Sequence, residues 1–346
     1  MSARPSSLLL RADASAEAGT GHVMRMLALG QAWQARGGDV TLATCAPEAL
    51  RARGSRMGAR IVEVPAATEP AADRATLEAA RGARAVALDG YAFGHELLAA
   101  LRQAGARVLV VDDNGENERY ASDLVLNQNL HARLAMYARR APWTQALLGP
   151  RYTLLRSEFR GHVAPPRPAP GARSRVLVSM GGADPVDATG ATLRALAELS
   201  VDERASLELR ALTGAANPRV EALQALAVGG LAEVLAPTDD IAPHLAWADV
   251  ALAAAGSTLW ELCALGVPAL LVPIADNQVE LAREVARRGA AIALPDARTS
   301  ADGRAWLAAA ASLARDDARR LAISSAARAL VDGEGAARVA AALDAA

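Results

Sequence analysis

Short runs of hydrophobic residues alternate along the chain with segments in which hydrophobic residues recur every three or four positions. Each short run predicts a buried strand, and each periodic segment predicts an amphipathic helix. In the first part of the chain the predicted strands cover residues 8–10, 40–44, 61–64, 85–88, 108–111 and 124–126. The predicted helices cover residues 22–36, 47–56, 73–81 and 94–103. This order predicts an α/β domain whose parallel sheet is covered on both faces.

The same alternation begins again after a proline-rich stretch. Residues 163–171 contain four prolines, which cannot continue a helix or a central strand, so this stretch predicts a stiff linker. We therefore expect an N-terminal domain at residues 1–162, a linker at 163–173 and a C-terminal domain at 174–346. In the second domain, strands are predicted at 176–179, 207–212, 234–235, 250–253 and 268–272, and helices at 188–199, from 217, 239–247, 259–265, 279–288 and through most of 300–346.

Composition and charge limit the class of protein. Of the 346 residues, 52% are hydrophobic, which excludes a disordered chain. The net charge of −1 gives no electrostatic reason to expect nucleic acid or an acidic membrane as a partner. No hydrophobic run is long enough to span a bilayer, and residues 8–10 are too short a run for the core of a signal peptide. We expect a cytoplasmic, monomeric protein without an integral membrane segment.

The distribution of cysteine, histidine and lysine narrows the chemistry. Cys45 and Cys263 are far apart in hydrophobic surroundings, which predicts two reduced core residues. The five histidines show no metal-ligand spacing, and the absence of lysine excludes Schiff-base chemistry, pyridoxal phosphate and a Walker A loop. The loop at residues 19–22 also lacks the third glycine of a dinucleotide fingerprint. We therefore expect neither a metal nor a cofactor.

The first candidate site is the loop that connects the first predicted strand to the first predicted helix. This loop contains Gly19 and Gly21, and His22 begins the helix. Free backbone N–H groups at a helix start favour anions, and the helix dipole tends to keep a histidine neutral there. A neutral histidine in that position can act as a general base, although a lone histidine can also be structural. Arg25, about one turn later, can pair with an acidic loop residue.

Polar residues gather where the predicted strands of the first domain end, at the edge where parallel α/β sheets bind ligands. For Asp13, ligand contact, orientation of His22 and a local structural role all remain open. For Asp89 and Asn114 we favour the simpler interpretation that they cap helices or make turns. The strand-end polar residues are Arg11, Asp13, Asp89, Asp112, Asp113, Asn127 and Gln128.

The second candidate site is the predicted start of a helix at residues 256–261. Gly256 permits a tight turn, and Ser257 and Thr258 add hydroxyl groups beside free N–H groups, which suits a phosphate or pyrophosphate. Glu261, one turn later, can accept hydrogen bonds from a ribose diol. An alternative is a capping box, in which Ser257 or Thr258 caps the helix and Glu261 reaches back. Weaker signals are Gly181-Gly182 as a further phosphate approach and Asn277-Gln278 as amides for sugar hydroxyl or acetamido groups.

Together these motifs resemble a known enzyme family, the UDP-2,4-diacetamido-2,4,6-trideoxy-β-L-altropyranose hydrolases of pseudaminic acid biosynthesis (PseG). That family is similar in fold to the GT-B glycosyltransferases, including MurG, which implies two Rossmann-like parallel-sheet domains that face a central cleft. The chain departs from the family at Ala255-Gly256, where many members have two glycines. The matching segments are Arg11 to Ser15, Gly19 to Arg25, Asp112-Asp113, Asn127 to Asn129, Leu148 to Phe159, Ser179 to Asp184 and Ala255 to Glu261.

The resemblance implies a metal-independent, inverting hydrolysis in which water attacks the anomeric carbon of a UDP-sugar and UDP leaves. It implies that His22 activates the water and that residues 256–261 hold the phosphates and ribose of UDP. The positions expected at the substrate, in addition to His22, are Arg11, Asp13, Gly19, Gly21, Asn127, Tyr152, Arg156, Gly182, Gly256, Ser257, Thr258, Glu261, Asn277 and Gln278.

The expected reaction needs few catalytic groups. UDP is a good leaving group, so no carboxylic acid has to protonate it, and helix-terminal N–H groups can stabilise its charge. One base then contributes about 10²–10⁴-fold in rate. Two other interpretations remain: a GT-B glycosyltransferase that moves the sugar from UDP to an acceptor, and a non-catalytic nucleotide-sugar sensor. A lipid acceptor would require an apolar or basic surface patch, which residues 36–84 do not show, so we expect the hydrolase.

Overall fold

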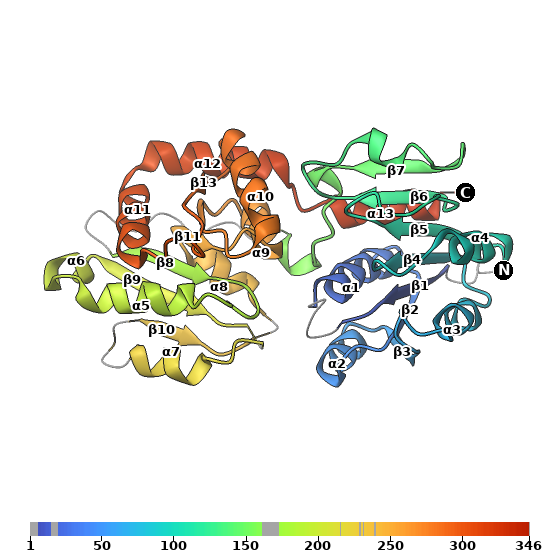
Figure 1. Ribbon diagram of the computed structural model, residues 1–346, viewed down its shortest axis with the longest axis horizontal. Helices are drawn as coiled ribbons and strands as arrows, with labels where there is room; N and C mark the ends of the chain where they lie inside the picture. Colours follow the sequence, from blue (N-terminus) through green and yellow to red (C-terminus); the bar gives the residue numbers. More distant parts are fainter. Residues whose placement is uncertain are drawn as a thin grey trace. The chain divides into compact units, whose positions relative to one another are not determined.

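A computed structural model describes residues 6–14, 20–160, 173–214, 216–227, 230, 232–238 and 240–345 of the chain. The chain forms two compact units (Figure 1), in which unit 1 comprises residues 1–157 and 333–346 and unit 2 comprises residues 158–332. Each unit contains a parallel sheet that carries helices. The expected class, α/β with two parallel-sheet domains, is confirmed.

Unit 1 contains a seven-stranded sheet with the order β3-β2-β1-β4-β5-β6-β7. Its strands are β1 (Ser7–Ala12), β2 (Asp39–Thr44), β3 (Arg60–Glu63), β4 (Ala85–Asp89), β5 (Arg107–Val111), β6 (Leu124–Asn127) and β7 (Gln145–Leu148). Its helices are α1 (Gly21–Gln34), α2 (Glu48–Arg56), α3 (Ala72–Ala79), α4 (His95–Gln103) and α13 (Gly335–Asp344), with the short 3-10 helices η1 (Leu134–Tyr137) and η2 (Pro150–Tyr152).

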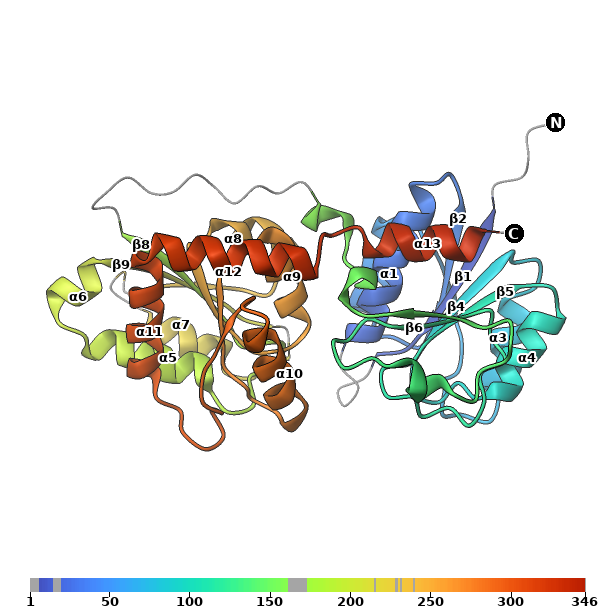
Figure 2. The same cartoon turned by 90° about the horizontal axis from the view of Figure 1, so that it is seen from above.

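Alternate residues of the unit 1 strands pack on opposite faces of the sheet. In β1, Leu8 and Leu10 belong to the cluster that also contains residues of α1 and α13, whereas Leu9 belongs to the cluster that contains residues of α4. This is the two-residue period of a strand that is buried on both sides. Figure 2 shows α1 and α13 on one side of this sheet and α4 on the other.

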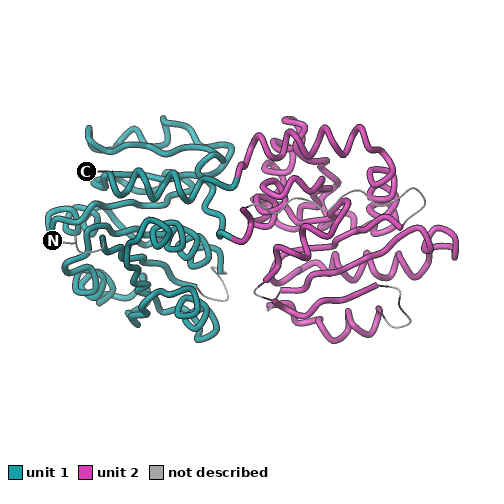
Figure 3. The backbone as a smooth tube through the Cα atoms, turned by 180° about the vertical axis from the view of Figure 1, so that it is seen from behind, with its two compact units in different colours: residues 1–157, 333–346 teal, residues 158–332 magenta. Residues whose placement is uncertain are grey.

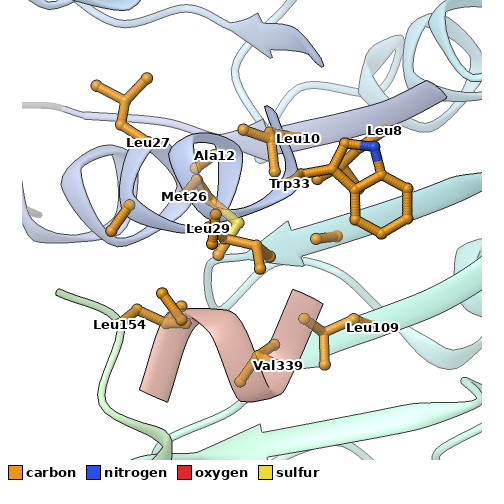
Figure 4. Close-up of a cluster of buried hydrophobic side chains, with 14 of the residues drawn as sticks. Leu8, Leu10, Ala12, Met26, Leu27, Leu29, Trp33, Leu109, Leu154 and Val339 are labelled. Atoms are coloured by element: carbon orange, nitrogen blue, oxygen red, sulfur yellow. The ribbon is translucent and has the colours of Figure 1, made fainter. Parts of the chain in front are cut away.

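The last helix, α13, returns to unit 1 after the chain has built unit 2 (Figure 3). Its buried residues recur at helical spacing, and Val339 packs in the same cluster as Met26 and Leu29 of α1 (Figure 4). We expected residues 174–346 to form one domain; residues 333–346 differ from that expectation because their apolar stripe is buried in the unit 1 core. Most of the expected linker at 163–173 lies outside the described residues.

Unit 2 contains a six-stranded parallel sheet with the order β10-β9-β8-β11-β12-β13. Its strands are β8 (Ser174–Ser179), β9 (Leu207–Leu212), β10 (Glu233–Leu235), β11 (Val250–Ala253), β12 (Ala269–Leu271) and β13 (Ile292–Ala293). Its helices are α5 (Ala188–Glu198), α6 (Val201–Ala205), α7 (Val220–Leu226), α8 (Ala242–Trp247), α9 (Ser257–Leu265), α10 (Asp276–Arg287), α11 (Gly303–Arg315) and α12 (Asp317–Leu330), and the 3-10 helix η3 (Ser157–Phe159) falls at the sequence boundary between the units.

Some elements were not predicted from the sequence. The edge strands β7 and β13 and the short helix α6 are too brief to give a clear period. The predicted helix from residue 217 begins only at Val220, because the Asn217 side chain accepts a hydrogen bond from the backbone N–H of Arg219 at 2.9 Å and forms a turn first. Among the described residues, the helices are all too short or too polar to cross a membrane.

Candidate functional site

In both sheets the strand order changes direction at one point, and the candidate residues follow the carboxyl ends of the strands beside it. In unit 1 this point lies between β1 and β4, whose paired residues include Ala12 and Asp89. In unit 2 it lies between β8 and β11, which pair at Ser179 and Ala253. Open α/β sheets bind ligands at such switch points. The two edges are therefore described in turn.

His22 is paired with Asp89 at the unit 1 edge. The Nδ1 atom of His22 lies 2.6 Å from Oδ1 of Asp89, and the histidine is 9% exposed. An ionised carboxylate only accepts hydrogen bonds, so Nδ1 is the donor in this contact, and in the neutral imidazole this tautomer leaves the lone pair on Nε2. This is the arrangement of a general base held by a carboxylate. The expected turn or capping role of Asp89 is corrected accordingly, and Asp89 rather than Asp13 orients the imidazole.

Arg25 joins this pair to a second carboxylate. Its Nη2 donates to Oδ1 of Asp89 at 2.8 Å and its Nη1 donates to Oδ2 of Asp113 at 2.8 Å. Burial alone would lower the pKa of Arg25, but Asp89 and Asp113 outweigh it and raise that pKa above its usual value. The guanidinium therefore stays charged and joins the last residue of β4 to the loop that follows β5. Pairing with an acidic loop residue, one of the roles considered for Arg25, is confirmed.

A buried network of two tyrosines supports the loop that carries Asp113. Tyr120 Oη donates to Oδ2 of Asp112 at 2.6 Å, and Tyr137 Oη donates to the backbone carbonyl of Asp112 at 2.6 Å. Asn127, expected at the substrate, instead donates from Nδ2 to Tyr137 Oη at 2.8 Å and to the carbonyl of Asp113 at 2.9 Å. Asn127 is buried, so the structure gives it a role in holding the loop.

The pH dependence of the free energy of unfolding should reveal how much this network stabilises the fold. Burial alone would raise the pKa of Asp112, but hydrogen bonds from Tyr120 and from the backbone N–H groups of Asn114 and Gly115 hold that pKa below its usual value. Such a carboxylate stabilises the fold above the unfolded pKa of about 3.9, and this stability is lost as pH falls through the folded value. Asp112→Asn should therefore lower the free energy of unfolding at pH 7 by about 2 kcal/mol.

Urea unfolding of the wild type and of the Asp112 variant at several pH values measures this difference. It should be constant between about pH 5 and 7 and shrink below about pH 4. Tyr120→Phe is the matched control, because it removes one hydrogen bond and leaves the carboxylate. A difference that does not change as the pH approaches 3 would contradict the role of the Asp112 charge.

Arg11 and Asp13 form a hydrogen-bonded brace in which Arg11 is fully buried and Asp13 is partly exposed. Arg11 is fully buried, its guanidinium contacts both carboxylate oxygens of Asp13, and Nη2 donates to the carbonyl of Pro65 at 2.9 Å. Asp13 also accepts from the backbone N–H groups of Cys45 at 3.0 Å and Ala67 at 2.7 Å. Burial alone would raise the pKa of Asp13, but Arg11 and these N–H groups lower it. The full burial of Arg11 differs from the expectation that it contacts the substrate, whereas substrate contact by Asp13 stays a prediction.

Several other predicted positions have different surroundings from those expected. Gly19 lies outside the described residues, while Gly21 is the exposed first residue of α1. Tyr152 is half-buried against the unit 1 core with the guanidinium of Arg151 5.1 Å from its ring centre, and Arg156 is buried. Cys45 is exposed and not a core residue as expected, because it follows the end of β2. Cys263 is buried, and burial raises its pKa to about 12.

The unit 2 edge contains a cavity of about 310 Å³ at the carboxyl ends of β8, β11 and β12. Three strand-to-helix connections supply its walls: the loop at residues 180–185 before α5, residues 254–258, which include the first two residues of α9, and residues 274–278, which include the first turn of α10. The predicted positions Gly182, Gly256, Ser257, Thr258 and Gln278 all line it. Asn277 is exposed beside it and is not among the lining residues. Most of the candidate residues chosen from the sequence of unit 2 therefore line this one cavity.

Three helices begin at this cavity, and α9 differs from α5 and α10 because, among the residues that the structure describes, no acidic side chain lies at its start. At α5, the Asp184 carboxylate accepts from the backbone N–H groups of Ala188 and Thr189, both at 2.9 Å. At α10, Asp276 places an acid in the first turn. In the described part of α9, no side chain caps Gly256 and the first turn contains no acid. The free N–H groups and the positive end of the helix dipole therefore favour an anion at α9.

The capping-box interpretation does not fit the start of α9. Gly256 is the N-cap, and Ser257 and Thr258 are the first two helical residues, so neither hydroxyl occupies the capping position. Glu261 lies one turn further along α9 and is partly buried. Its contact with a ribose remains a prediction.

The amide of Gln278 has a fixed orientation at the cavity. Its Oε1 accepts a hydrogen bond from the backbone N–H of Ile274 at 3.1 Å. The other end, Nε2, lies toward Gly256, where a side-chain Cβ would be 4.0 Å from it. Gln278 therefore presents a donor to the space beside the start of α9, as recognition of a ligand oxygen requires.

Tyr91 was missed as a functional candidate, Asp89 was interpreted as a cap or turn residue, and Asp113 was named at the sheet edge without a role. Tyr91 is 65% exposed, and its ring lies edge-on to His22 with centroids 5.2 Å apart. The sequence contained one signal for the acids, because both follow predicted strands. Predicting which acid pairs with His22 required the strand order, which places the end of β4 beside the end of β1.

Two parallel-sheet α/β domains with polar residues at both switch points define the GT-B class of fold. A solved structure, MurG from Acinetobacter baumannii, matches with a TM-score of 0.64 and 19% identity, covering 98% of this chain and 99% of that chain. More specifically, residues 177–337 match the model of the glycosyltransferase family 28 C-terminal domain. This segment contains the whole unit 2 cavity.

Curated relatives carry transferase and polysaccharide-biosynthesis names. The UDP-N-acetylglucosamine–N-acetylmuramyl-(pentapeptide) pyrophosphoryl-undecaprenol N-acetylglucosamine transferase of Sorangium cellulosum (strain So ce56) is 36% identical over 271 residues, 74% of this chain and 63% of that protein. The spore coat polysaccharide biosynthesis protein SpsG of Bacillus subtilis (strain 168) is 27% identical over 240 residues, 68% of each protein. The chain spans less than two thirds of the first transferase relatives, at 63%, 48% and 64% of their lengths.

These comparisons correct the expected activity. The similarity to GT-B proteins and to MurG in fold is confirmed. The expected hydrolase of pseudaminic acid biosynthesis is contradicted, because the similar proteins are named as N-acetylglucosamine transferases and the matched domain is that of a glycosyltransferase family. The transferase alternative fits these findings better.

Proposed function

We propose that the protein is a glycosyltransferase that moves a sugar from UDP to a hydroxyl group of an acceptor. The observation that carries this proposal is the unit 2 cavity, in which the uncapped start of α9 meets the fixed amide of Gln278 within a family 28 C-terminal domain. A relative that is 36% identical is named for the transfer of N-acetylglucosamine from its UDP derivative. UDP-N-acetylglucosamine is therefore the first donor to test.

In this proposal the diphosphate of the donor binds at the start of α9. Backbone N–H groups and the hydroxyls of Ser257 and Thr258 surround it, and the helix dipole stabilises the charge that grows on UDP as it leaves. Gly182 leaves room for close approach, since a Cβ at this position would have no neighbour within 4 Å. Glu261 is the proposed acceptor of the ribose hydroxyls.

His22 is the proposed base for the acceptor. Its Nε2 takes the proton from the acceptor hydroxyl while that oxygen bonds to the anomeric carbon of the sugar. The bond from the anomeric carbon to the phosphate oxygen breaks, and UDP leaves with the electron pair. A single displacement of this kind inverts the anomeric configuration. Asp89 stabilises the imidazolium that forms, and Arg25 holds Asp89 in place.

Acceptor-dependent release of UDP tests the proposal. The full-length protein is incubated with UDP-N-acetylglucosamine and a panel of hydroxyl acceptors, and UDP and glycoside products are measured by coupled assay and mass spectrometry. We expect UDP release to rise at least tenfold with a suitable acceptor, together with a product heavier by one sugar. UDP release at the same rate with and without every acceptor would contradict transfer.

A further inference from the structure

Tyr91 gives the His22 site an exposed aromatic face. It follows Asp89 at the end of β4, and its ring stands edge-on to the His22 ring at 5.2 Å, with an interplanar angle of 88°. Gly90 makes this turn with φ +156°, a region that favours glycine. A tyrosine that is 65% exposed beside a buried, hydrogen-bonded histidine is available to a ligand rather than used in the core.

The charges that surround this aromatic face are predominantly negative. Asp89 and Asp113 supply two carboxylates, and in the part of unit 1 that the structure describes the guanidinium of Arg25 bonds to both. Two carboxylates against one guanidinium leave one net negative charge among Asp89, Asp113 and Arg25. Asn129 donates from Nδ2 to Oδ1 of Asp113 at 2.7 Å, which leaves the carboxylate in place without neutralising it.

From this geometry we infer that the acceptor is a neutral sugar whose apolar face stacks on Tyr91, and not a molecule with a phosphate or pyrophosphate group beside its reacting hydroxyl. The inference deepens the proposed transferase function and rests on it. Sugar rings have C–H groups on one face that pack on aromatic rings, whereas a phosphate near Asp89 and Asp113 would be repelled. The Tyr91 hydroxyl remains protonated, because burial and then the Asp113 charge raise its pKa, so it also offers a hydrogen-bond donor.

The neutral acceptor proposed for this protein differs in charge from the acceptor that the name of one relative contains. The Sorangium protein is named for a pyrophosphoryl-undecaprenol acceptor. Within the described part of unit 1, the hydrogen bonds of Arg25 go to Asp89 and Asp113, so this arginine is committed to the site itself. Arg11 is likewise buried against Asp13. A neutral acceptor avoids the need for a free cation at this edge.

The first test compares two acceptors that share one sugar. Octyl β-N-acetylglucosaminide is neutral, and the same sugar joined through pyrophosphate to a short prenol is anionic; both are assayed with UDP-N-acetylglucosamine at low salt. We expect kcat/KM to be at least tenfold higher for the neutral acceptor. Asp113→Asn, which leaves Arg25 with one carboxylate, should reduce that preference about tenfold. A preference of the wild type for the pyrophosphate acceptor would overturn the inference.

The second test isolates Tyr91 and does not depend on turnover. Tyr91→Ala should weaken binding of the neutral glycoside at least tenfold in saturation-transfer NMR with UDP present, while Tyr91→Phe, which keeps the ring, changes it less than threefold. UDP affinity by calorimetry should be the same in both variants. Equal glycoside binding by wild type and Tyr91→Ala would overturn the inference. Loss of transfer with both acceptors, with Tyr91-dependent binding retained, would instead count against the proposed reaction and support the acceptor class.

Discussion

His22→Asn is expected to lower kcat for sugar transfer by about 10²–10⁴-fold, the contribution of a positioned general base. Asparagine can still donate a hydrogen bond to Asp89, so the fold of α1 and its neighbours is preserved, but it cannot take a proton from an acceptor. The affinity for UDP should be unchanged, because the proposed diphosphate site is formed by the residues of unit 2.

Steady-state kinetics and UDP calorimetry on the same preparations separate these effects. His95→Asn on α4 is the control for loss of an imidazole elsewhere in unit 1. Asp89→Asn should give an intermediate loss of kcat, since the imidazole remains but its tautomer is no longer fixed. A His22→Asn protein with the kcat of the wild type would show that another group removes the proton.

Ser257→Asp is expected to weaken UDP binding at least 100-fold, equivalent to about 2.8 kcal/mol. The new carboxylate would occupy the uncapped start of α9, where the diphosphate is proposed to bind, and two like charges about 4 Å apart near a protein surface repel by about 4 kcal/mol. The same carboxylate should stabilise the helix by about 0.3–1 kcal/mol, because it lies at the positive end of the dipole. Binding and stability should therefore change in opposite directions.

Calorimetry with UDP and thermal unfolding measure the two effects. Ser312→Asp adds the same charge at an exposed position of α11 and should leave UDP affinity unchanged. Ser257→Ala should weaken binding less than tenfold, because the backbone N–H groups remain. If Ser257→Asp binds UDP as tightly as the wild type, the start of α9 is not the phosphate site.

The strands and the two glycine-containing loops were accessible from the sequence, because their signals are local. Hydrophobic runs ending at Asp89 or leading to Gly256 reflect the burial of parallel strands, and polar residues must follow at the sheet edge. The partner of His22 was not accessible in the same way. Asp89 is 67 residues from His22, and the two meet only because β4 pairs with β1. Strand order is a property of the whole sheet.

A polar residue at the sheet edge can also bind a neighbouring side chain, and residue type alone does not reveal this. Arg11 and Asp13 lie at the correct sheet edge, but they are two residues apart and satisfy each other, as only the side-chain directions reveal. The activity posed a different difficulty. Water and an acceptor hydroxyl attack the same anomeric carbon with the help of the same base, so the residues that activate one also suit the other.

The return of α13 to unit 1 has a consequence for biosynthesis. Four residues of α13 complete a core whose other members precede residue 158, namely Ala336, Val339, Ala340 and Leu343. This core therefore stays open until the ribosome has passed through all of unit 2. The apolar face of α1 that α13 covers must therefore remain protected from aggregation during synthesis, by chaperones or by transient burial. Unit 2, in contrast, is one continuous segment and can reach its native packing first.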